Sequence, residues 1–318
     1  MKIVILDGYT MGSTDLSCNP LEKLGDFTYY DRSTPEKVLT RAKEAEIVVV
    51  NKIIMSREVI DALPKLRCIA VSATGYNTVD LEAAAERDIT VCNVPGYSSP
   101  SAAQFTFALI LELCSKVSEH HQAVLSGEWG KSPDFCFWNS PLIELQGKTL
   151  GVVGYGDIGR HVAKLGHAFG MKILAYAPRP KEAPDYAPFE FVELEALLKK
   201  ADIISTHCPL TADNERFIND STIEKMKSGV MLINTARGPL IDEGALIKGL
   251  QSGKIGGAAL DVVTLEPLPD SSPLLTAPNC IITPHIAWAT KESRNRLLQT
   301  CADNIQAFIA GIPQNKVS

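Results

Sequence analysis

Residues 149–159 have the sequence TLGVVGYGDIG, and this stretch decides the fold. An apolar run that ends in GxGxxG predicts a buried strand, a tight turn and the start of a helix. Gly154 permits the turn, Gly156 lets a ligand approach the backbone, and Gly159 lets the helix pack closely on the strand. The alternative, a glycine-rich turn without a ligand, is disfavoured by the flanking strand and helix. We expect a dinucleotide pyrophosphate at Gly154, Gly156, Asp157, Ile158 and Gly159.

Strands and helices alternate on both sides of this turn. Apolar or β-branched runs predict the remaining strands at 2–7, 47–50, 68–72, 89–92, 172–175, 203–206, 230–234, 257–260 and 280–283. Helices are predicted between them at 35–45, 56–63 and 80–87, and at the end of the chain at 291–310. Continuous apolar strands separated by helices are typical of parallel sheets covered on both faces. The predicted fold is therefore α/β, with doubly wound parallel sheets.

The composition excludes several classes of protein. The chain has 318 residues, of which 45% are hydrophobic and 21% charged, so it is long enough for two domains with full cores. The formal net charge is −6 and no basic tract is present. This charge balance argues against nucleic acid or an anionic membrane as a partner.

Cysteine spacing and apolar run length indicate the compartment. The eight cysteines form no CxxC pair and no zinc-finger spacing, so we expect no metal and mostly buried thiols in a reducing compartment. No apolar stretch reaches about 18 residues, and the N-terminal MKIVILDG lacks the features of a signal peptide. We expect a cytoplasmic protein without a membrane span.

Residues 101–145 break the alternating pattern. The segment 101–125 predicts one long helix that is apolar on most sides and therefore buried in the protein or against another subunit. A loop at 126–145 that contains Gly, Pro and Ser follows, and it carries four aromatic side chains: Trp129, Phe135, Phe137 and Trp138. Crowded loop aromatics indicate either a subunit interface or packing within the chain.

The strand at 172–175 bears on the choice of dinucleotide. An acidic residue about 20 positions after the glycine turn would hold the ribose 2′-hydroxyl of NAD. Here the strand is followed by Ala177, Pro178 and Arg179 instead. Arg179 is positioned to pair with a 2′-phosphate, which favours NADP over NAD. The simpler alternative is that Arg179 is a solvated loop residue and either dinucleotide is used.

Three polar residues follow three different predicted strands. Arg237 lies in NTARG, Glu266 in DVVTLEP and His285 in TPHIA. In open α/β sheets, ligands bind at the carboxyl edge of the strands, so these side chains are expected in one cleft. Taken singly, each has a plain explanation as a loop, surface or core residue.

Together these residues fit one reaction, the reduction of a 2-keto acid. His285 is suited to donate a proton to the carbonyl oxygen, and a carboxylate beside it would orient the imidazole and favour its charged form. Arg237 is suited to bind the substrate carboxylate.

With these residues in view, the chain resembles the D-isomer-specific 2-hydroxyacid dehydrogenases over nearly its whole length. The motifs that carry the resemblance are GYGDIG, HCPLT at 207–211, NTARG at 234–238, DVVTLEP at 261–267 and TPHIAWAT at 283–290. Within the family, the segments at 7–10, 72–80, 134–138 and 285–288 are most similar to glycerate dehydrogenases, also called hydroxypyruvate reductases. One departure is Asn214, where the family usually has Thr.

The resemblance implies further roles. Asp261 would hold the nicotinamide carboxamide, and the loop at Thr74 and Gly75 would receive the substrate carboxylate through its backbone amides, although a plain turn explains this loop equally well. The remaining dinucleotide contacts implied are Thr106, His207, Cys208, Pro209, Thr235, Ala236 and Ala287.

The resemblance also implies an architecture. Residues 1–100 and 290–318 would form a flavodoxin-like substrate domain, and 101–289 a Rossmann-type dinucleotide domain, with a cleft between them. The segment 101–145 would mediate a homodimer, and whether Trp138 reaches a neighbouring subunit's site is left open.

The expected substrate is a small 2-keto acid. Hydroxypyruvate or glyoxylate is favoured, while pyruvate or a bulkier keto acid stays open. The alternative function is that of a dinucleotide-sensing, corepressor-like binding protein without turnover, because fold alone does not fix function.

Overall fold

The computed structural model describes residues 1–12, 16–179 and 181–317. The chain divides into two compact units. The first unit combines Met1–Ser98 with Trp288–Ser318, and the second is Ser99–Ala287. The chain therefore leaves the first unit and returns to it, and both crossings lie two residues before the expected domain boundaries at 100/101 and 289/290.

The first unit is built on a five-stranded parallel sheet. Its strands are β1 (Lys2–Ile5), β2 (Asp26–Tyr29), β3 (Ile47–Val50), β4 (Cys68–Val71) and β5 (Thr90–Cys92). The strand order β2-β1-β3-β4-β5 is the flavodoxin-like order, as expected. β2 was not predicted from the sequence, because this edge strand is only partly buried and has no run of β-branched residues.

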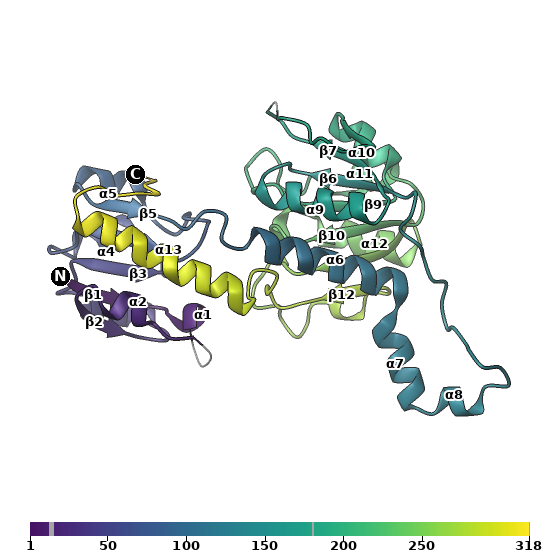
Figure 1. The fold of residues 1–318 in the computed structure, drawn as a ribbon, viewed down its shortest axis with the longest axis horizontal. Helices are drawn as coiled ribbons and strands as arrows, with labels where there is room; N and C mark the ends of the chain where they lie inside the picture. The colour runs from purple at the N-terminus through teal and green to yellow at the C-terminus, as the bar shows by residue number, and fades with distance from the viewer. Residues whose placement is uncertain (13–15, 180, 318) are drawn as a thin grey trace. The chain divides into compact units, whose positions relative to one another are not determined.

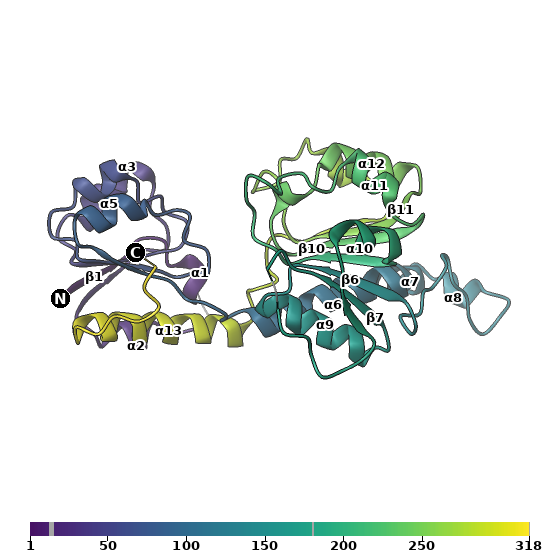
Figure 2. The same ribbon diagram turned by 90° about the horizontal axis from the view of Figure 1, so that it is seen from above.

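Helices cover both faces of this sheet (Figure 2). One face is covered by α3 (Pro35–Ala42), α4 (Arg57–Asp61) and α5 (Leu81–Glu86). The other face is covered by α1 (Tyr9–Gly12), α2 (Asn19–Glu22) and the C-terminal helix α13 (Lys291–Ile309). Side chains at the N-caps of α4 and α5 fix where these helices begin, since Ser56 accepts from the amide of Val59 and Asp80 from that of Ala83.

The second unit is built on a seven-stranded parallel sheet. Its strands are β6 (Thr149–Val153), β7 (Lys172–Tyr176), β8 (Phe189–Phe191), β9 (Ile203–Thr206), β10 (Val230–Asn234), β11 (Ile255–Leu260) and β12 (Cys280–Ile282). Read from β8, the order β8-β7-β6-β9-β10-β11-β12 contains the doubly wound dinucleotide-binding order and adds one strand at the far edge. The expected count of six was one too low, because β8 is a three-residue edge strand.

Two sets of helices enclose the second sheet (Figures 1 and 2). One face is covered by α6 (Ser99–Ser115) and α9 (Asp157–Ala168). The other face is covered by α10 (Leu194–Lys200), α11 (Asp220–Lys225) and α12 (Glu243–Gln251). The glycine turn lies between β6 and α9, so the start of α9 is at the carboxyl end of a central strand.

The single helix predicted over 101–125 is two helices. α6 and α7 (Val117–Leu125) meet at Lys116, whose φ of 51° is left-handed and ends an α-helix. α6 is mostly buried, whereas α7 buries only Ala123, so the prediction of one buried helix was wrong for its second half. Apolar content does not reveal this break, because lysine is a good helix former.

Residues 117–144, called the arm below, extend away from the rest of the second unit (Figure 1). The arm includes α7 and the short α8 (Glu128–Lys131). Its most exposed apolar side chains are Val117, Leu125, Trp129, Phe135, Trp138 and Leu142. Within the arm, the indole of Trp129 donates to the carbonyl of Phe135 at 3.0 Å.

Two further expectations from the sequence concern membrane spans and the cysteines. Among the described residues, no helix is long and apolar enough to cross a membrane. All eight cysteines are free thiols. The expectation that they are buried holds for five of them and is wrong for Cys136, which lies exposed on the arm.

Candidate functional site

The glycine turn has the geometry that a pyrophosphate requires. Gly154 has a φ of 100°, and a Cβ there would lie 2.6 Å from main-chain atoms of His207 and Cys208. A Cβ on Gly159 would lie 2.1 Å from the carbonyl oxygen of Gly154, so the helix approaches the turn closely. At Gly156, the N-cap of α9, a Cβ would meet nothing within 4 Å, which leaves open space at the helix N-terminus.

The loop that follows β9 packs directly on this turn. The amide of His207 donates to the carbonyl of Val153 at 2.7 Å, and its Nε2 is 2.8 Å from Oγ of Ser205. Burial lowers the pKa of His207 to about 3, so its imidazole is neutral at pH 7. Nδ1 of His207 is buried and has no hydrogen-bond partner in the described part of the chain.

Asn214 shapes the rest of this loop. Its Oδ1 accepts from the amide of Thr211 at 2.7 Å, and its Nδ2 donates to the carbonyl of Pro209 at 2.8 Å. Burial raises the pKa of the neighbouring Cys208 thiol to about 11, so this cysteine is not a thiolate at pH 7. Asn214, which replaces the family's usual Thr, thus stabilises the loop through two side-chain hydrogen bonds.

The turn after β10 is organised by Asn234. Its Oδ1 accepts from Thr206 and from the amide of Ala236, and its Nδ2 donates to the carbonyl of Arg237. Asn234 itself is 1% exposed, whereas Arg237 is exposed and donates from Nη1 to the carbonyl of Ala236 at 2.7 Å. The hydrogen bonds of the buried Asn234 side chain therefore hold this turn in a shape that leaves the guanidinium of Arg237 exposed to solvent.

Thr106 and Thr235 lie together although 129 residues separate them. Their hydroxyl oxygens are 3.0 Å apart, and Thr106 also donates to the carbonyl of Ala102 within α6. Thr106 is fully buried, so α6 is fixed against the turn after β10 at this point. The structure thus brings together two of the residues expected to contact the dinucleotide.

Asp261, at the end of β11, holds the segment that carries His285. Its carboxylate accepts from the Thr283 hydroxyl at 2.6 Å and from the amides of Ile286 at 2.9 Å and Ala287 at 2.8 Å. Asp261 is 1% exposed, and charge-assisted bonds of this kind compensate the burial of a carboxylate. The residue therefore has a structural role that the sequence analysis did not identify, beside the expected one.

Glu266 and His285 form a hydrogen-bonded pair. Nδ1 of His285 is 2.7 Å from Oε2 of Glu266, and the other carboxylate oxygen accepts from the amide of Val263 at 3.3 Å. Both side chains are partly exposed, 28% for the histidine and 36% for the glutamate. His285 has a φ of 55°, a conformation that few residues other than glycine adopt and that is often found at active sites.

The turns that carry Arg237 and Glu266 are in contact. A Cβ on Gly238 would lie 2.0 Å from the main-chain carbon and oxygen of Val263, so only glycine allows this approach. The structure therefore assembles Glu266, His285 and the Arg237 turn on one edge of the second sheet. This agrees with the expectation that the three strand ends meet.

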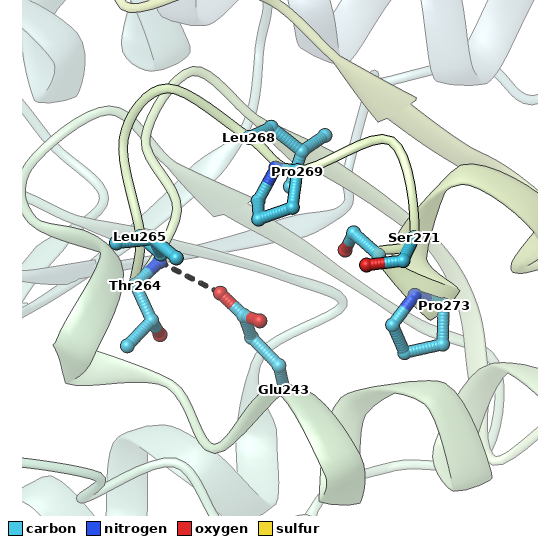
Figure 3. A pocket seen from close by; sticks show the side chains of 8 residues that line it. Glu243, Thr264, Leu265, Leu268, Pro269, Ser271 and Pro273 are labelled. Atoms are coloured by element: carbon cyan, nitrogen blue, oxygen red, sulfur yellow. Dashed lines mark hydrogen bonds between the residues drawn. The ribbon is translucent and has the colours of Figure 1, made fainter.

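A small pocket lies behind the Glu266 loop (Figure 3). Its volume is about 280 Å³, and its lining residues are Glu243, Thr264, Leu265, Leu268, Pro269, Ser271, Ser272 and Pro273. Glu243, the first residue of α12, points toward the loop and accepts from the amide of Thr264 at 2.7 Å. Glu243 was missed by the sequence analysis, since an acidic residue in the first turn of a helix is common.

In the first unit, Thr74 and Gly75 lie in the loop after β4. Three successive carbonyls of this loop accept hydrogen bonds: that of Ser72 from Asn51 Nδ2, that of Ala73 from the amide of Val94, and that of Thr74 from Asn93 Nδ2. The amides of Thr74 and Gly75 donate to no group in the described part of the chain. The neighbouring amides at 51–53 differ, because all three donate to the carboxylate of Asp7.

Two other expectations concern the ligands. Arg179 is exposed beyond the end of β7, and Ala177 is half-buried there. The described residues contain no group of three or more His, Cys, Asp or Glu side chains placed to hold a metal ion.

Comparisons with known proteins show which family the chain belongs to. A model of the NAD binding domain of D-isomer specific 2-hydroxyacid dehydrogenases matches residues 107–287. A hydroxypyruvate reductase of Blautia hydrogenotrophica is 47% identical over 321 residues and is aligned over 100% of both chains. A glycerate dehydrogenase of Methylorubrum extorquens is 39% identical, with 99% of this chain and 98% of that protein covered.

A solved structure shows the same fold. The D-lactate dehydrogenase of Aquifex aeolicus, crystallised with NAD and lactic acid, superposes with a TM-score of 0.83 at 31% identity. The alignment covers 98% of this chain and 96% of that chain.

Proposed function

We propose that this chain, which belongs to the D-isomer specific 2-hydroxyacid dehydrogenase family, reduces hydroxypyruvate, and also the smaller glyoxylate, to the 2-hydroxy acid. Family membership makes it an oxidoreductase of 2-keto and D-2-hydroxy acids that uses a nicotinamide dinucleotide. The observation that carries the proposal is the Glu266–His285 pair at 2.7 Å, because carbonyl reduction needs a placed proton donor. The name and similarity of the Blautia relative support hydroxypyruvate as the substrate.

The residues of the second unit fit a bound dinucleotide. The open space at Gly156 admits a pyrophosphate to the N-terminus of α9, and the Thr106–Thr235 hydroxyl pair lies where β10 ends, at the carboxyl edge of the same parallel sheet. The orphaned Nδ1 of His207 offers a neutral hydrogen-bonding group beside this turn. When bound, a reduced nicotinamide supplies a hydride to the carbonyl carbon of the substrate.

His285 and Glu266 are assigned the proton transfer. Because Nδ1 of His285 is bonded to Glu266, the ring delivers its proton from Nε2 to the carbonyl oxygen as the carbon accepts the hydride. The π electrons of the C=O bond move to that oxygen, so the new O–H bond uses the histidine proton. Glu266 orients the imidazole through Nδ1, and its carboxylate favours the charged form of the ring that donates the proton.

Substrate binding is assigned to Arg237 and to the loop at Thr74 and Gly75. The exposed guanidinium suits a carboxylate, and the amides of Thr74 and Gly75, which donate to no group among the described residues, are suited to bind an anion. The loop at Thr74 and Gly75 belongs to the first unit, whereas Arg237, the dinucleotide turn and the proton donor belong to the second.

The dinucleotide is proposed to be NADP in preference to NAD. β7 ends without an acidic residue, and Arg179 is exposed just beyond it. A carboxylate at this place would repel a 2′-phosphate, whereas a guanidinium attracts one.

We further propose a cytoplasmic homodimer in which the arm is the subunit contact. The arm exposes large apolar side chains, including Trp129, Phe135 and Trp138. An exposed apolar segment of this kind is typical of protein interfaces.

The test follows the absorbance loss of NADH and of NADPH with hydroxypyruvate, glyoxylate, pyruvate and phenylpyruvate. Fast NADPH oxidation with hydroxypyruvate or glyoxylate would support the substrate and the role of Arg179. A strong preference for NADH would overturn the dinucleotide assignment alone. A folded chain that binds dinucleotide but turns over none of the four acids would overturn the proposal and favour a sensor.

A further inference from the structure

Three asparagines of the first unit connect the C-terminal segment to the loop at Thr74. Asn315 Nδ2 donates to Oδ1 of Asn304 at 2.8 Å, and Asn304 Nδ2 donates to the carbonyl of Asn93 at 2.8 Å. Asn93 Nδ2 then donates to the carbonyl of Thr74 at 2.7 Å. The series runs from the chain end, through α13, to the loop after β4.

Asn93 is the junction of the series. The backbone N–H of Asn93 donates to the carbonyl of Asn315 at 3.2 Å, and its backbone carbonyl accepts from Asn304 in α13. The C-terminal segment and α13 therefore each bind one backbone group of Asn93. Asn304 and Asn93 are 1% and 8% exposed. Burying an amide side chain is unfavourable unless it is hydrogen-bonded, so these two side chains are stable only in this arrangement.

The C-terminal segment, residues 313–317, is attached to the sheet edge. Lys316 forms an antiparallel bridge with Cys92, and the amide of Val317 donates to the carbonyl of Val91 at 2.9 Å. The segment thus lies beside β5, where Figure 1 places the C-terminus. Asn315 has a φ of 49°, a left-handed conformation that asparagine tolerates better than most residues.

The geometry of the peptide bond shows what these contacts do to the loop. In a planar trans peptide, the C=O of one residue and the N–H of the next point in opposite directions. Asn93 holds the carbonyl of Thr74, so the amide of Gly75 is directed away from Asn93. The backbone N–H of Val94 donates to the carbonyl of Ala73, so the amide of Thr74 is likewise directed away from Val94.

We infer that the C-terminal segment is a positioning element for the carboxylate-binding loop and acts through Asn315, Asn304 and Asn93. The inference rests on the proposed function, in which the amides of Thr74 and Gly75 receive the substrate carboxylate. None of the three asparagines touches the substrate in this scheme. Their effect is to keep the loop, and with it the directions of its two amide donors, fixed before the substrate arrives, which reduces the ordering cost of binding.

The first variant is Asn315→Gly, compared with Gln314→Ala at an exposed neighbouring position. Glycine keeps the left-handed backbone of residue 315 and removes only the side chain. We expect Asn315→Gly to raise KM for the 2-keto acid about 5- to 10-fold, the effect of losing one hydrogen bond in the series. kcat and the dinucleotide Kd should stay within about twofold, because the lost interaction concerns substrate binding only. Gln314→Ala should leave all three unchanged.

Hydrogen exchange of the intact chain supplies a readout that does not depend on turnover. In Asn315→Gly, the amides of residues 72–77 should exchange faster than in the unaltered chain. A second variant, Asn93→Ala, should have the larger effect on exchange and KM. Val38→Ala removes core methyl groups from α3 in the same unit and controls for general destabilisation.

The outcomes separate the two claims. Unchanged exchange at 72–77 in Asn315→Gly would overturn the inference, and so would faster exchange with an unchanged KM. An equal rise of KM in Val38→Ala would also overturn it, because a general loss of stability would then explain the effect. Absence of turnover in the unaltered chain would overturn the proposed function instead, while exchange would still decide whether the segment holds the loop.

Discussion

The loop at Thr74 in the first unit and the loops of Glu266 and His285 in the second unit are held by opposite means. In the first unit, the side chains of Asn51 and Asn93 donate to loop carbonyls, which leaves backbone amides directed away from the protein. In the second unit, the carboxylates of Asp261 and Glu243 accept from loop amides. Because these amides donate within the protein, the loops offer side chains rather than amides to a ligand.

This difference matches the two tasks of a 2-keto acid reductase. An anion is bound well by directed amides, because they carry partial positive charge without a protonation equilibrium. Proton transfer needs a titratable side chain, and His285 is suited to it because Glu266 is bonded to its ring and the carboxylate of Asp261 accepts from the next two backbone amides. Donor side chains therefore accompany the binding loop, and acceptor side chains accompany the proton-transfer loops.

The largest effect should come from removing His285, the proposed proton donor. In His285→Asn, kcat for 2-keto acid reduction should fall about 10²- to 10⁴-fold, the usual contribution of a general acid. The dinucleotide Kd, measured by NADH or NADPH fluorescence, should stay within about threefold. Glu266→Gln should lower kcat less, because the histidine remains and only its orientation and charge stabilisation are weakened.

Variants of the two units should differ in which kinetic constant changes, kcat or KM. Changes at His285 should act on kcat, whereas changes in the asparagine series should act on KM. If His285→Asn retains more than a tenth of the kcat of the unaltered chain, another group donates the proton and the assignment of tasks to the two units is wrong.

A smaller effect is expected from the carboxylate that holds the Glu266 loop. Glu243→Ala removes the acceptor of the Thr264 amide and should lower kcat about 10-fold, since the loop loses one charge-assisted bond. Glu243→Gln keeps an oxygen acceptor in the same place and should retain at least half of the activity. Steady-state kinetics of both variants, with thermal unfolding as a control, measure this difference. Equal losses in the two variants would show that charge at residue 243, rather than support of the loop, is what counts.

Much of this arrangement could be predicted from the sequence, and the limits have physical causes. β3 and β10 are fully buried apolar strands, so hydrophobic runs located them correctly. The pairing of Glu266 with His285 followed from the rule that strand ends meet at one sheet edge. β8 was missed because a short edge strand buries little and leaves a weak pattern.

The supporting residues were missed for a different reason. Asn93, Asn304 and Asn315 are distant in sequence, and nothing in their neighbours distinguishes a buried asparagine from a turn residue. Glu243 also has the sequence of an ordinary first helical turn. Their roles depend on which carbonyl or amide lies opposite, and only the tertiary structure supplies that information.

The smallest expected effect concerns His207, which contrasts with His285 in the same unit. His285 has a carboxylate partner, whereas His207 is bonded to Ser205 and burial lowers its pKa to about 3. An unfolded histidine titrates near 6.5, so below this pH the unfolded chain binds a proton that the folded chain excludes. The contribution of His207 to folding stability is therefore retained above about pH 6.5 and is lost as the pH falls toward 3.

The variant His207→Gln isolates this term, because all other titrating groups are shared with the unaltered chain. Between pH 7.5 and 5.5, the unaltered chain should lose about 1 kcal/mol more unfolding free energy than the variant, since each pH unit below 6.5 contributes up to about 1.4 kcal/mol. Urea unfolding at the two pH values measures the difference, and between pH 7.5 and 8.5 the two chains should change in parallel. If they also change in parallel down to pH 5.5, His207 takes up a proton within the fold. A histidine beside the glycine turn would then be able to carry charge toward a bound phosphate, and the contrast between an uncharged His207 and a carboxylate-paired His285 would fail.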